Sequence, residues 1–190
     1  MASIIPKQTQ RGGLIKVVLF GPESTGKTTL SRDLSAHYKA PWVPEFARDF
    51  LQEKWDKTQQ ICTQEDLIPI AVGQMETENE ALTKADKLLI CDTDVLETLA
   101  YSYWYFGPEA DPRLEEAAQQ AQYDLYLLTY IDTPWTPDDL RDQPEARPEL
   151  FTHFENCLKR FGRNFVILKG NPQQRLNKAI EHIDNLIHHL

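Results

Sequence analysis

Residues 14–34, LIKVVLFGPESTGKTTLSRDL, decide the fold. The apolar run 14–20 has the length of a buried strand, and residues 29–38 have the character of a helix. The loop between them, residues 21–28, fits the pattern G-x-x-x-x-G-K-[ST]. A strand, a glycine-bounded loop and a helix N-terminus form the context in which this pattern binds phosphate. The stretch therefore predicts a site for a nucleoside triphosphate.

The residue types in this loop suit the binding of phosphate groups. Gly21 and Gly26 allow backbone angles closed to other residues, so that successive N–H groups point inward and form an anion-binding nest. The following helix directs its free N–H groups at the same point. Lys27 places a cation on the outer phosphates, and the Thr28 hydroxyl can bind Mg²⁺. The expected ATP-binding residues of the loop are Gly21, Glu23, Ser24, Thr25, Gly26, Lys27, Thr28 and Thr29.

The composition is typical of a soluble globular protein. With 190 residues, 41% of them hydrophobic, the chain is long enough to bury a core, and we expect one domain over residues 14–190 after a mobile arm, residues 1–13. A net charge of −9 without a long basic stretch argues against nucleic acid or a membrane as partner. The three scattered cysteines Cys62, Cys91 and Cys157 favour the reducing cytoplasm.

Four further apolar segments read as strands separated by helices. They are residues 40–45, 87–92, 123–129 and 164–169. Strands alternating with helices predict a three-layer α/β domain with a mainly parallel, five-stranded sheet and right-handed crossovers. The helices are expected at residues 46–55, 64–85 (capped by Thr63), 95–106, 109–122 and 173–190.

Charged residues follow two of these strands where ligands of open parallel sheets gather. Asp92 ends the third strand, where a phosphate-loop enzyme needs an acid for the water shell of Mg²⁺ or for a proton. Asp94 points the same way if the strand continues, and it also suits the cap of the next helix. Glu45 and Arg48 follow the second strand and are candidate substrate contacts, or a helix-start acid and a surface arginine.

The helix at residues 95–106 carries more aromatic side chains than one core face needs. Tyr101 and Trp104 lie off the face formed by its apolar residues, together with Glu97. They predict either a stacking platform for a flat, possibly cationic ring, or a wide core face or dimer contact.

The segment at residues 132–147 is proline-spaced, charged and too long for a simple connection. Loops of this length in compact domains are usually functional, and we expect a lid at about residues 132–150. Arg141 and Arg147 suit contacts to phosphates when the lid closes, although one of them can equally be a paired surface arginine.

These parts favour a small-molecule kinase over other phosphate-loop proteins. The guanine-reading motif of GTPases is absent from its proper place, and motor-type or AAA-type ATPases normally need more chain. A kinase needs a nest, a carboxylate at a strand end, a substrate pocket and a lid that excludes water.

Four motifs resemble the ribosylnicotinamide kinase family, the kinase domain of the bacterial regulator of NAD synthesis, here expected as a free-standing protein. They are GPESTGKTTL (residues 21–30), VPEFAR (43–48), CDTD (91–94) and W-x-P-D-x-L-R-D (135–142). The likeness runs from about residue 14 to 185, and related proteins often carry only the label of AAA-family ATPases.

The resemblance implies ATP-dependent phosphorylation of the 5′-hydroxyl of nicotinamide riboside, with Mg²⁺ as cofactor. Lys27, Asp92 and Arg141 are then the expected catalytic residues, Thr28 and Asp92 the metal ligands, and Arg147 a further ATP contact. The expected substrate contacts are Glu45, Arg48, Asp94, Tyr101, Trp104 and Trp135. The rival hypotheses are a kinase for another nucleoside or small alcohol, and an ATP-binding regulatory module that acts on a partner protein.

Overall fold

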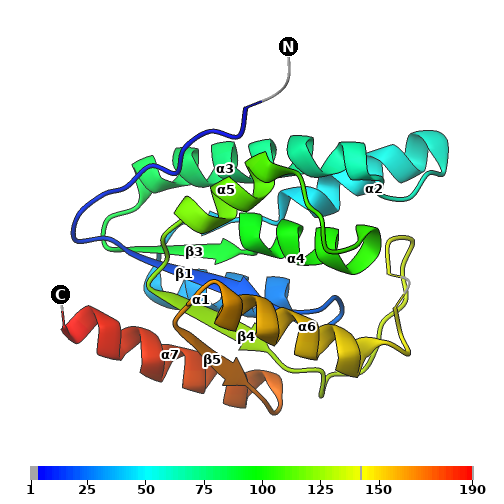
Figure 1. Ribbon diagram of the computed structural model, residues 1–190. Helices are drawn as coiled ribbons and strands as arrows, with labels where there is room; N and C mark the ends of the chain where they lie inside the picture. The colour runs from blue at the N-terminus through cyan, green and yellow to red at the C-terminus, as the bar shows by residue number, and fades with distance from the viewer. Residues whose placement is uncertain (1–3, 142, 190) are drawn as a thin grey trace.

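A five-stranded sheet forms the centre of the computed structural model, which describes residues 4–141 and 143–189. Its strand order is β2-β3-β1-β4-β5, and the paired strands all run parallel (Figure 1). The strands are β1 (Ile15–Phe20), β2 (Trp42–Val43), β3 (Leu88–Asp92), β4 (Leu125–Thr129) and β5 (Phe165–Leu168). The predicted α/β fold is confirmed, and the observed order places β1 between β3 and β4.

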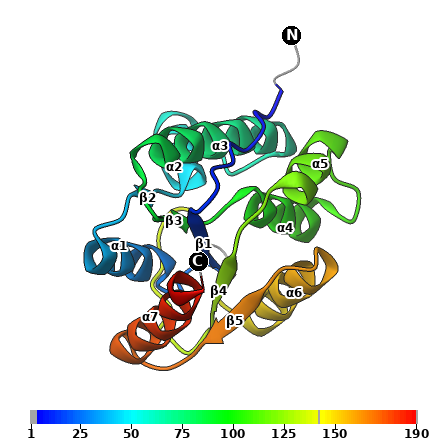
Figure 2. The ribbon, with the colours of Figure 1, turned by 90° about the vertical axis from the view of Figure 1, so that its left-hand side faces the viewer.

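Helices cover both faces of the sheet and make three layers (Figure 2). One face carries α1 (Lys27–Tyr38) and α7 (Pro172–His188), which contact each other. The other carries α3 (Leu67–Lys84), α4 (Val95–Phe106), α5 (Pro112–Gln120) and α6 (Arg147–Arg160), with α2 (Phe46–Thr58) packed on α3. Parallel strands need this double cover because both of their faces are apolar. No helix in the described residues is long and apolar enough to span a membrane.

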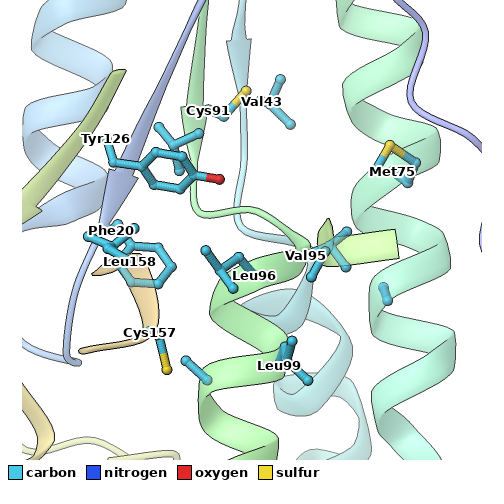
Figure 3. Packing of buried hydrophobic residues seen from close by; sticks show 14 of the residues in the cluster. Phe20, Val43, Met75, Cys91, Val95, Leu96, Leu99, Tyr126, Cys157 and Leu158 are labelled. Carbon is cyan, nitrogen blue, oxygen red and sulfur yellow. The ribbon is translucent and has the colours of Figure 1, made fainter. Parts of the chain in front are cut away.

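The side chains of β1 alternate between two buried clusters, because successive residues of a strand point to opposite faces. Val17 and Leu19 pack on the side of α1 and α7, whereas Val18 and Phe20 belong to the cluster under α3, α4 and α6. Figure 3 shows this second cluster, in which Phe20 and Tyr126 meet edge to face with ring centroids 5.6 Å apart. Burial on both faces fixes β1 and therefore the start of the loop that follows it.

Several helix starts differ from the prediction: α5 begins at Pro112 instead of residue 109, and α6 (Arg147–Arg160) is not among the predicted helices. The helix expected at residues 64–85 is built as a 3-10 turn, Gln64–Asp66, followed by α3. Thr63 caps this turn as predicted, through reciprocal hydrogen bonds with Asp66. Helix α1 begins at Lys27, two residues earlier than expected, because Gly26 takes a left-handed φ of 83° and ends the loop there.

Residues 5–11 contact the domain, whereas a mobile arm is expected for residues 1–13, of which residues 1–3 lie outside the described residues. Ile5 is buried, the Gln8 side chain donates to Glu78 Oε1 at 2.7 Å, and Thr9 O accepts from Lys16 Nζ at 2.7 Å. Lys16 and Glu78 are both buried at the amino end of the sheet and need polar partners there. The segment supplies these partners, which its own sequence does not reveal.

Candidate active site

Strand pairing brings the phosphate loop and the end of β3 to one edge of the sheet. Leu19 of β1 pairs with Asp92 of β3, and the loop begins at Gly21, two residues after Leu19. In open parallel sheets, ligands bind outside the carboxyl ends of the strands. The register therefore places the Asp92 carboxylate beside the start of the loop.

The loop has the backbone shape that its glycines predict. Gly21 has a φ of 137°, and a Cβ atom there would stand 2.8 Å from Thr129 Oγ1. Ser24 and Gly26 also have positive φ values, 56° and 83°. Left-handed residues inside such a turn direct backbone N–H groups toward one point, which is the geometry of an anion nest.

Thr25 fixes the loop from within, whereas its neighbour Thr29 is exposed on α1. The Thr25 hydroxyl lies 2.7 Å from both Pro22 O and Thr129 Oγ1. Arg175, buried on α7, donates to Thr25 O at 2.6 Å. The contacts of Thr25 thus stabilise the shape of the loop. Arg175 stabilises the loop as well, although no sequence motif indicates it.

Lys27 is folded back over the loop. Its Nζ donates to the carbonyls of Gly21 and Pro22 at 2.7 and 3.1 Å and lies 3.2 Å from Glu97 Oε1. Burial lowers the pKa of Lys27, but the surrounding carboxylates, first among them Glu97, raise it by more. The lysine is therefore held in its charged form at the mouth of the nest.

Asp92 is fully buried and has an unusual environment. Among the described residues, neither oxygen of its carboxylate has a hydrogen-bond partner. Burial raises the pKa of Asp92 to about 6, with a further increase from Glu45, while Thr28 and Lys27 act in the opposite direction. The next residue, Thr93, has a left-handed φ of 70°, a strained conformation that ends the strand there.

The surroundings of Asp92 fit a magnesium ion bound together with phosphates. A buried carboxylate without partners is costly unless a ligand satisfies it, and the Thr28 side chain lies close enough to lower the pKa of Asp92. Within the described parts of the chain, no cluster of three or more His, Cys, Asp or Glu side chains could hold a metal by itself. Mg²⁺ does not need one, since it keeps several waters and takes other oxygens from phosphates.

Of the two charged residues after β2, one lies by the loop and the other by the lid. Glu45 is half-buried, and its charge raises the pKa of both Lys27 and Asp92, so it belongs to the acid cluster around the lysine. Arg48 instead makes a two-pronged contact with Asp138 of the lid segment, with N–O distances of 3.2 and 2.9 Å.

Asp94 does not face the site, contrary to its expected role as a substrate contact. Its side chain is fully buried, accepts from the Glu97 backbone N–H at 3.1 Å and accepts from the Tyr126 hydroxyl at 2.7 Å. The turn at Thr93 breaks the strand, so that Asp94 becomes the N-cap of α4, the alternative that its sequence position also allowed.

Glu97 is the member of the site to which the sequence assigned no role. It lies in the first turn of α4, is 3% exposed, and accepts from Gly21 N at 3.3 Å while it pairs with Lys27. Burial raises its pKa well above the ordinary value, although Lys27 opposes this. The only signal in the sequence is a glutamate off the apolar face of a helix that follows the Asp92 strand.

The structure separates the three aromatic residues expected around the substrate. Tyr101 lies near the acid cluster, because Glu97, Glu23 and Glu45 all raise the pKa of its hydroxyl after burial itself. Trp104 packs against His153 of α6, with ring centroids 5.5 Å apart, in the partly buried layer between the two helices. Of the two α4 residues expected to contact the substrate, Tyr101 lies nearer the acid cluster, and its ring also packs against Phe154 of α6 with centroids 5.0 Å apart.

The lid segment lies against the phosphate loop beyond the carboxyl ends of the strands (yellow in Figure 1). Glu23 accepts from the Gln143 N–H at 3.1 Å, and Ser24 Oγ accepts from the Thr136 N–H at 2.9 Å. Arg147 donates to Ser24 O at 3.3 Å. The side chains of Glu23 and Ser24 thus join the loop to the lid.

The two lid arginines have different partners. Arg141 stays within the lid, where it contacts Asp138 at 3.0 Å and donates to Thr136 O at 2.6 Å. Arg147 lies over the ring of Trp135 at 5.6 Å, and its buried Nε has no hydrogen-bond partner in the described residues. Arg147 is thus the lid arginine that reaches the loop. Asp142, the last residue of the W-x-P-D-x-L-R-D motif, lies outside the described residues.

Comparison with known proteins agrees with this arrangement. Residues 16–175 match the family described as AAA domain. The trifunctional NAD biosynthesis/regulator protein NadR of Salmonella typhimurium is 28% identical over 137 residues, which are 72% of this chain and 33% of NadR. The chain thus matches about one third of the length of this relative.

Solved structures share the fold. A NadR protein in complex with NR superposes with a TM-score of 0.77 at 24% identity, over 91% of this chain and 51% of the other. Thymidylate kinase from Ehrlichia chaffeensis reaches a TM-score of 0.64 at 14% identity, over 90% and 99% of the two chains. The fold is that of P-loop nucleoside kinases, and the similarity to NadR agrees with the resemblance to the ribosylnicotinamide kinase family. With the family match covering most of its length, the chain belongs to the AAA domain family.

Proposed function

We propose that this protein is a small-molecule kinase that transfers the terminal phosphoryl group of ATP to the 5′-hydroxyl of nicotinamide riboside, giving nicotinamide mononucleotide. The observation that carries the proposal is the attachment of the lid to the phosphate loop through Glu23, Ser24 and Arg147. A kinase has to keep water away from the phosphoryl group, and a lid that closes over the loop does so. An ATPase needs water at the same place.

The phosphates are assigned to the loop and its cations. The N–H groups of the nest and Lys27 bind them, and Arg147, rather than Arg141, approaches them from the lid. The contact of Arg147 with Ser24 O and its unpaired Nε support this choice. Thr28 and Asp92 would hold Mg²⁺, which offsets phosphate charge when bound.

The acceptor is assigned to the acid cluster beside Lys27. In this proposal Glu45 accepts hydrogen bonds from the ribose hydroxyls, and Asp92 orients the 5′-hydroxyl. The pyridinium ring of nicotinamide riboside is a flat cation, which suits half-buried Glu45 and the aromatic ring of Tyr101. The likeness to NadR, one structure of which holds NR, supports this acceptor over other nucleosides. The free cysteines are consistent with a cytoplasmic location of the proposed enzyme.

The proposal is tested by ADP release from ATP and Mg²⁺ with a panel of acceptors: nicotinamide riboside, the common ribonucleosides and deoxyribonucleosides, and no acceptor. We expect strong stimulation by nicotinamide riboside alone. Asp92→Asn should abolish it, while Asp94→Asn, which changes a buried cap two residues away, should retain most of it in the folded protein.

The other outcomes separate the alternatives. Stimulation by a different nucleoside would keep the kinase and replace its substrate. Slow ADP release that no acceptor stimulates would contradict the kinase and favour a nucleotide-sensing module.

A further inference from the structure

A carboxylate from outside the phosphate loop lies against the loop. Glu97 Oε2 accepts from Gly21 N at 3.3 Å, and Oε1 lies 3.2 Å from Lys27 Nζ. Glu97 comes from α4, outside the phosphate-loop motif, and its side chain is almost fully buried. A side-chain carboxylate therefore contacts Lys27, the cation that would otherwise bind phosphate oxygens.

The ammonium group of Lys27 has three close oxygen neighbours, two through hydrogen bonds and one through an ion pair. An ammonium group has three N–H donors, and Lys27 Nζ has three neighbours: Gly21 O at 2.7 Å, Pro22 O at 3.1 Å and Glu97 Oε1 at 3.2 Å. The two carbonyl contacts hold the lysine over the loop. Only the third direction, toward Glu97, remains for a phosphate oxygen, so that nucleotide and glutamate compete for it.

The charges around Lys27 make this competition costly for a nucleotide. Glu97, Glu45 and Asp92 all act on Lys27, and the further titratable groups around them are Tyr101, Glu23 and Arg32. Phosphates would add negative charge to a buried site that already holds more acids than cations. Charges of one sign in such a site favour the uptake of a proton by one of them.

We infer that Glu97 is a positioning residue that occupies the phosphate position on Lys27 in the empty protein and sets nucleotide affinity by giving up that contact. The inference rests on the nucleotide-binding part of the proposed function and is independent of the acceptor. Of the two oxygens, Oε2 accepts a hydrogen bond from the Gly21 N–H, whereas Oε1 is held by its ion pair with Lys27 and has no hydrogen-bond partner within the described residues.

A proton linkage follows from this role. Protonated Glu97 no longer repels phosphate, so nucleotide affinity should be highest at low pH and should fall as pH rises through the pKa of Glu97. Burial places that pKa well above the ordinary value, which moves the change to higher pH than for an exposed glutamate. Glutamine in its place keeps the side-chain length and an oxygen for the Gly21 N–H, but carries no charge.

The test is calorimetric titration of the purified full chain with MgADP at pH 6 and pH 8. We compare the wild type with Glu97→Gln and with Glu78→Gln as matched control. Glu78 also pairs with a buried lysine at 3.2 Å, but at the opposite end of β1. We expect Glu97→Gln to bind MgADP about tenfold more tightly than the wild type at pH 8, with a smaller difference at pH 6. Glu78→Gln should bind like the wild type at both values.

Comparison between variants cancels the titration of the nucleotide itself. A folded Glu97→Gln protein that binds MgADP no more tightly than the wild type at pH 8 would overturn the inference. The wild type alone provides a second measurement, in buffers of different ionisation enthalpy at pH 8, where we expect proton uptake on binding; its absence would also overturn the inference. Neither result depends on whether any acceptor stimulates ADP release, the readout that decides the kinase.

Discussion

Two buried lysine–glutamate pairs lie at opposite ends of β1 and have different roles. Lys16 and Glu78 stand at the amino end of the strand, Lys27 and Glu97 beyond its carboxyl end. In both pairs the closest N–O distance is 3.2 Å and both side chains are buried. Distance and burial therefore do not distinguish them.

The hydrogen bonds around the two glutamates distinguish the two pairs. Glu78 accepts from Gln8 at 2.7 Å on one oxygen and from the Tyr123 hydroxyl at 2.6 Å on the other. Lys16 of the same pair also donates to Thr9 O. Glu97 has one oxygen without a hydrogen bond in the described residues. A saturated buried pair holds the structure together, whereas an unsaturated pair leaves room for a ligand.

The largest contrast is expected between the two lysines. Lys27→Met should reduce phosphoryl transfer at least about a hundredfold, because it removes a preorganised cation from the charge that develops on the phosphates. Lys16→Met should leave the turnover of the folded protein within about twofold of the wild type. ADP release at saturating ATP measures both; equal losses in the two variants would contradict the division of roles.

The glutamates should show the reverse order in stability. Glu78→Gln leaves Lys16 buried without a counter-charge and should lower the free energy of unfolding by about 3–5 kcal/mol. Glu97→Gln should change it by less than about 1 kcal/mol, because Lys27 keeps two carbonyl partners and nearby acids. Urea unfolding of the nucleotide-free proteins gives both values. A larger loss for Glu97→Gln would show that its pair is structural after all.

Deletion of residues 1–11 tests the structural role of the pair formed by Lys16 and Glu78. It removes the Gln8 and Thr9 contacts from Glu78 and Lys16 and should destabilise the domain by about 2–3 kcal/mol, the cost of leaving buried polar groups unpaired. MgADP affinity should not change. A truncated protein as stable as the full chain would indicate that water replaces these contacts without loss.

The smallest effect is expected at the lid. The pair of Arg48 and Asp138 is partly exposed, with side chains 38% and 23% accessible, and such pairs contribute about 0–1 kcal/mol. Arg48→Ala should therefore raise the KM for the acceptor by less than about fivefold and leave unfolding unchanged. Arg147→Ala, which removes a contact to the loop itself, should have the larger effect on the KM for ATP.

Local patterns in the sequence are sufficient for the loop, the five strands and the position of Asp92. The phosphate-loop motif and the apolar runs are contiguous, and parallel pairing brings their ends together. Asp94 differs from its expected role as a substrate contact for a local reason too. The left-handed turn at Thr93 interrupts the alternation of strand side chains, and no composition rule predicts that turn.

The lysine–glutamate pairs could not be predicted in the same way. Lys16 and Glu78 are 62 residues apart, and Glu97 reaches Lys27 from a different helix. Such contacts depend on how α3 and α4 pack on the sheet, which is a tertiary property. The same holds for Arg175, whose contact with Thr25 O spans 150 residues. The sequence therefore indicates the residues of the motif but not the distant residues that hold the loop in place.

The most direct measurement of the proposed reaction is ³¹P NMR of the protein with ATP, Mg²⁺ and nicotinamide riboside. We predict the growth of a phosphomonoester signal with the chemical shift of nicotinamide mononucleotide. It should grow in step with ADP, and no equivalent amount of inorganic phosphate should form. Inorganic phosphate as the main product, with nicotinamide riboside unchanged, would show that water reaches the phosphoryl group and would contradict the kinase.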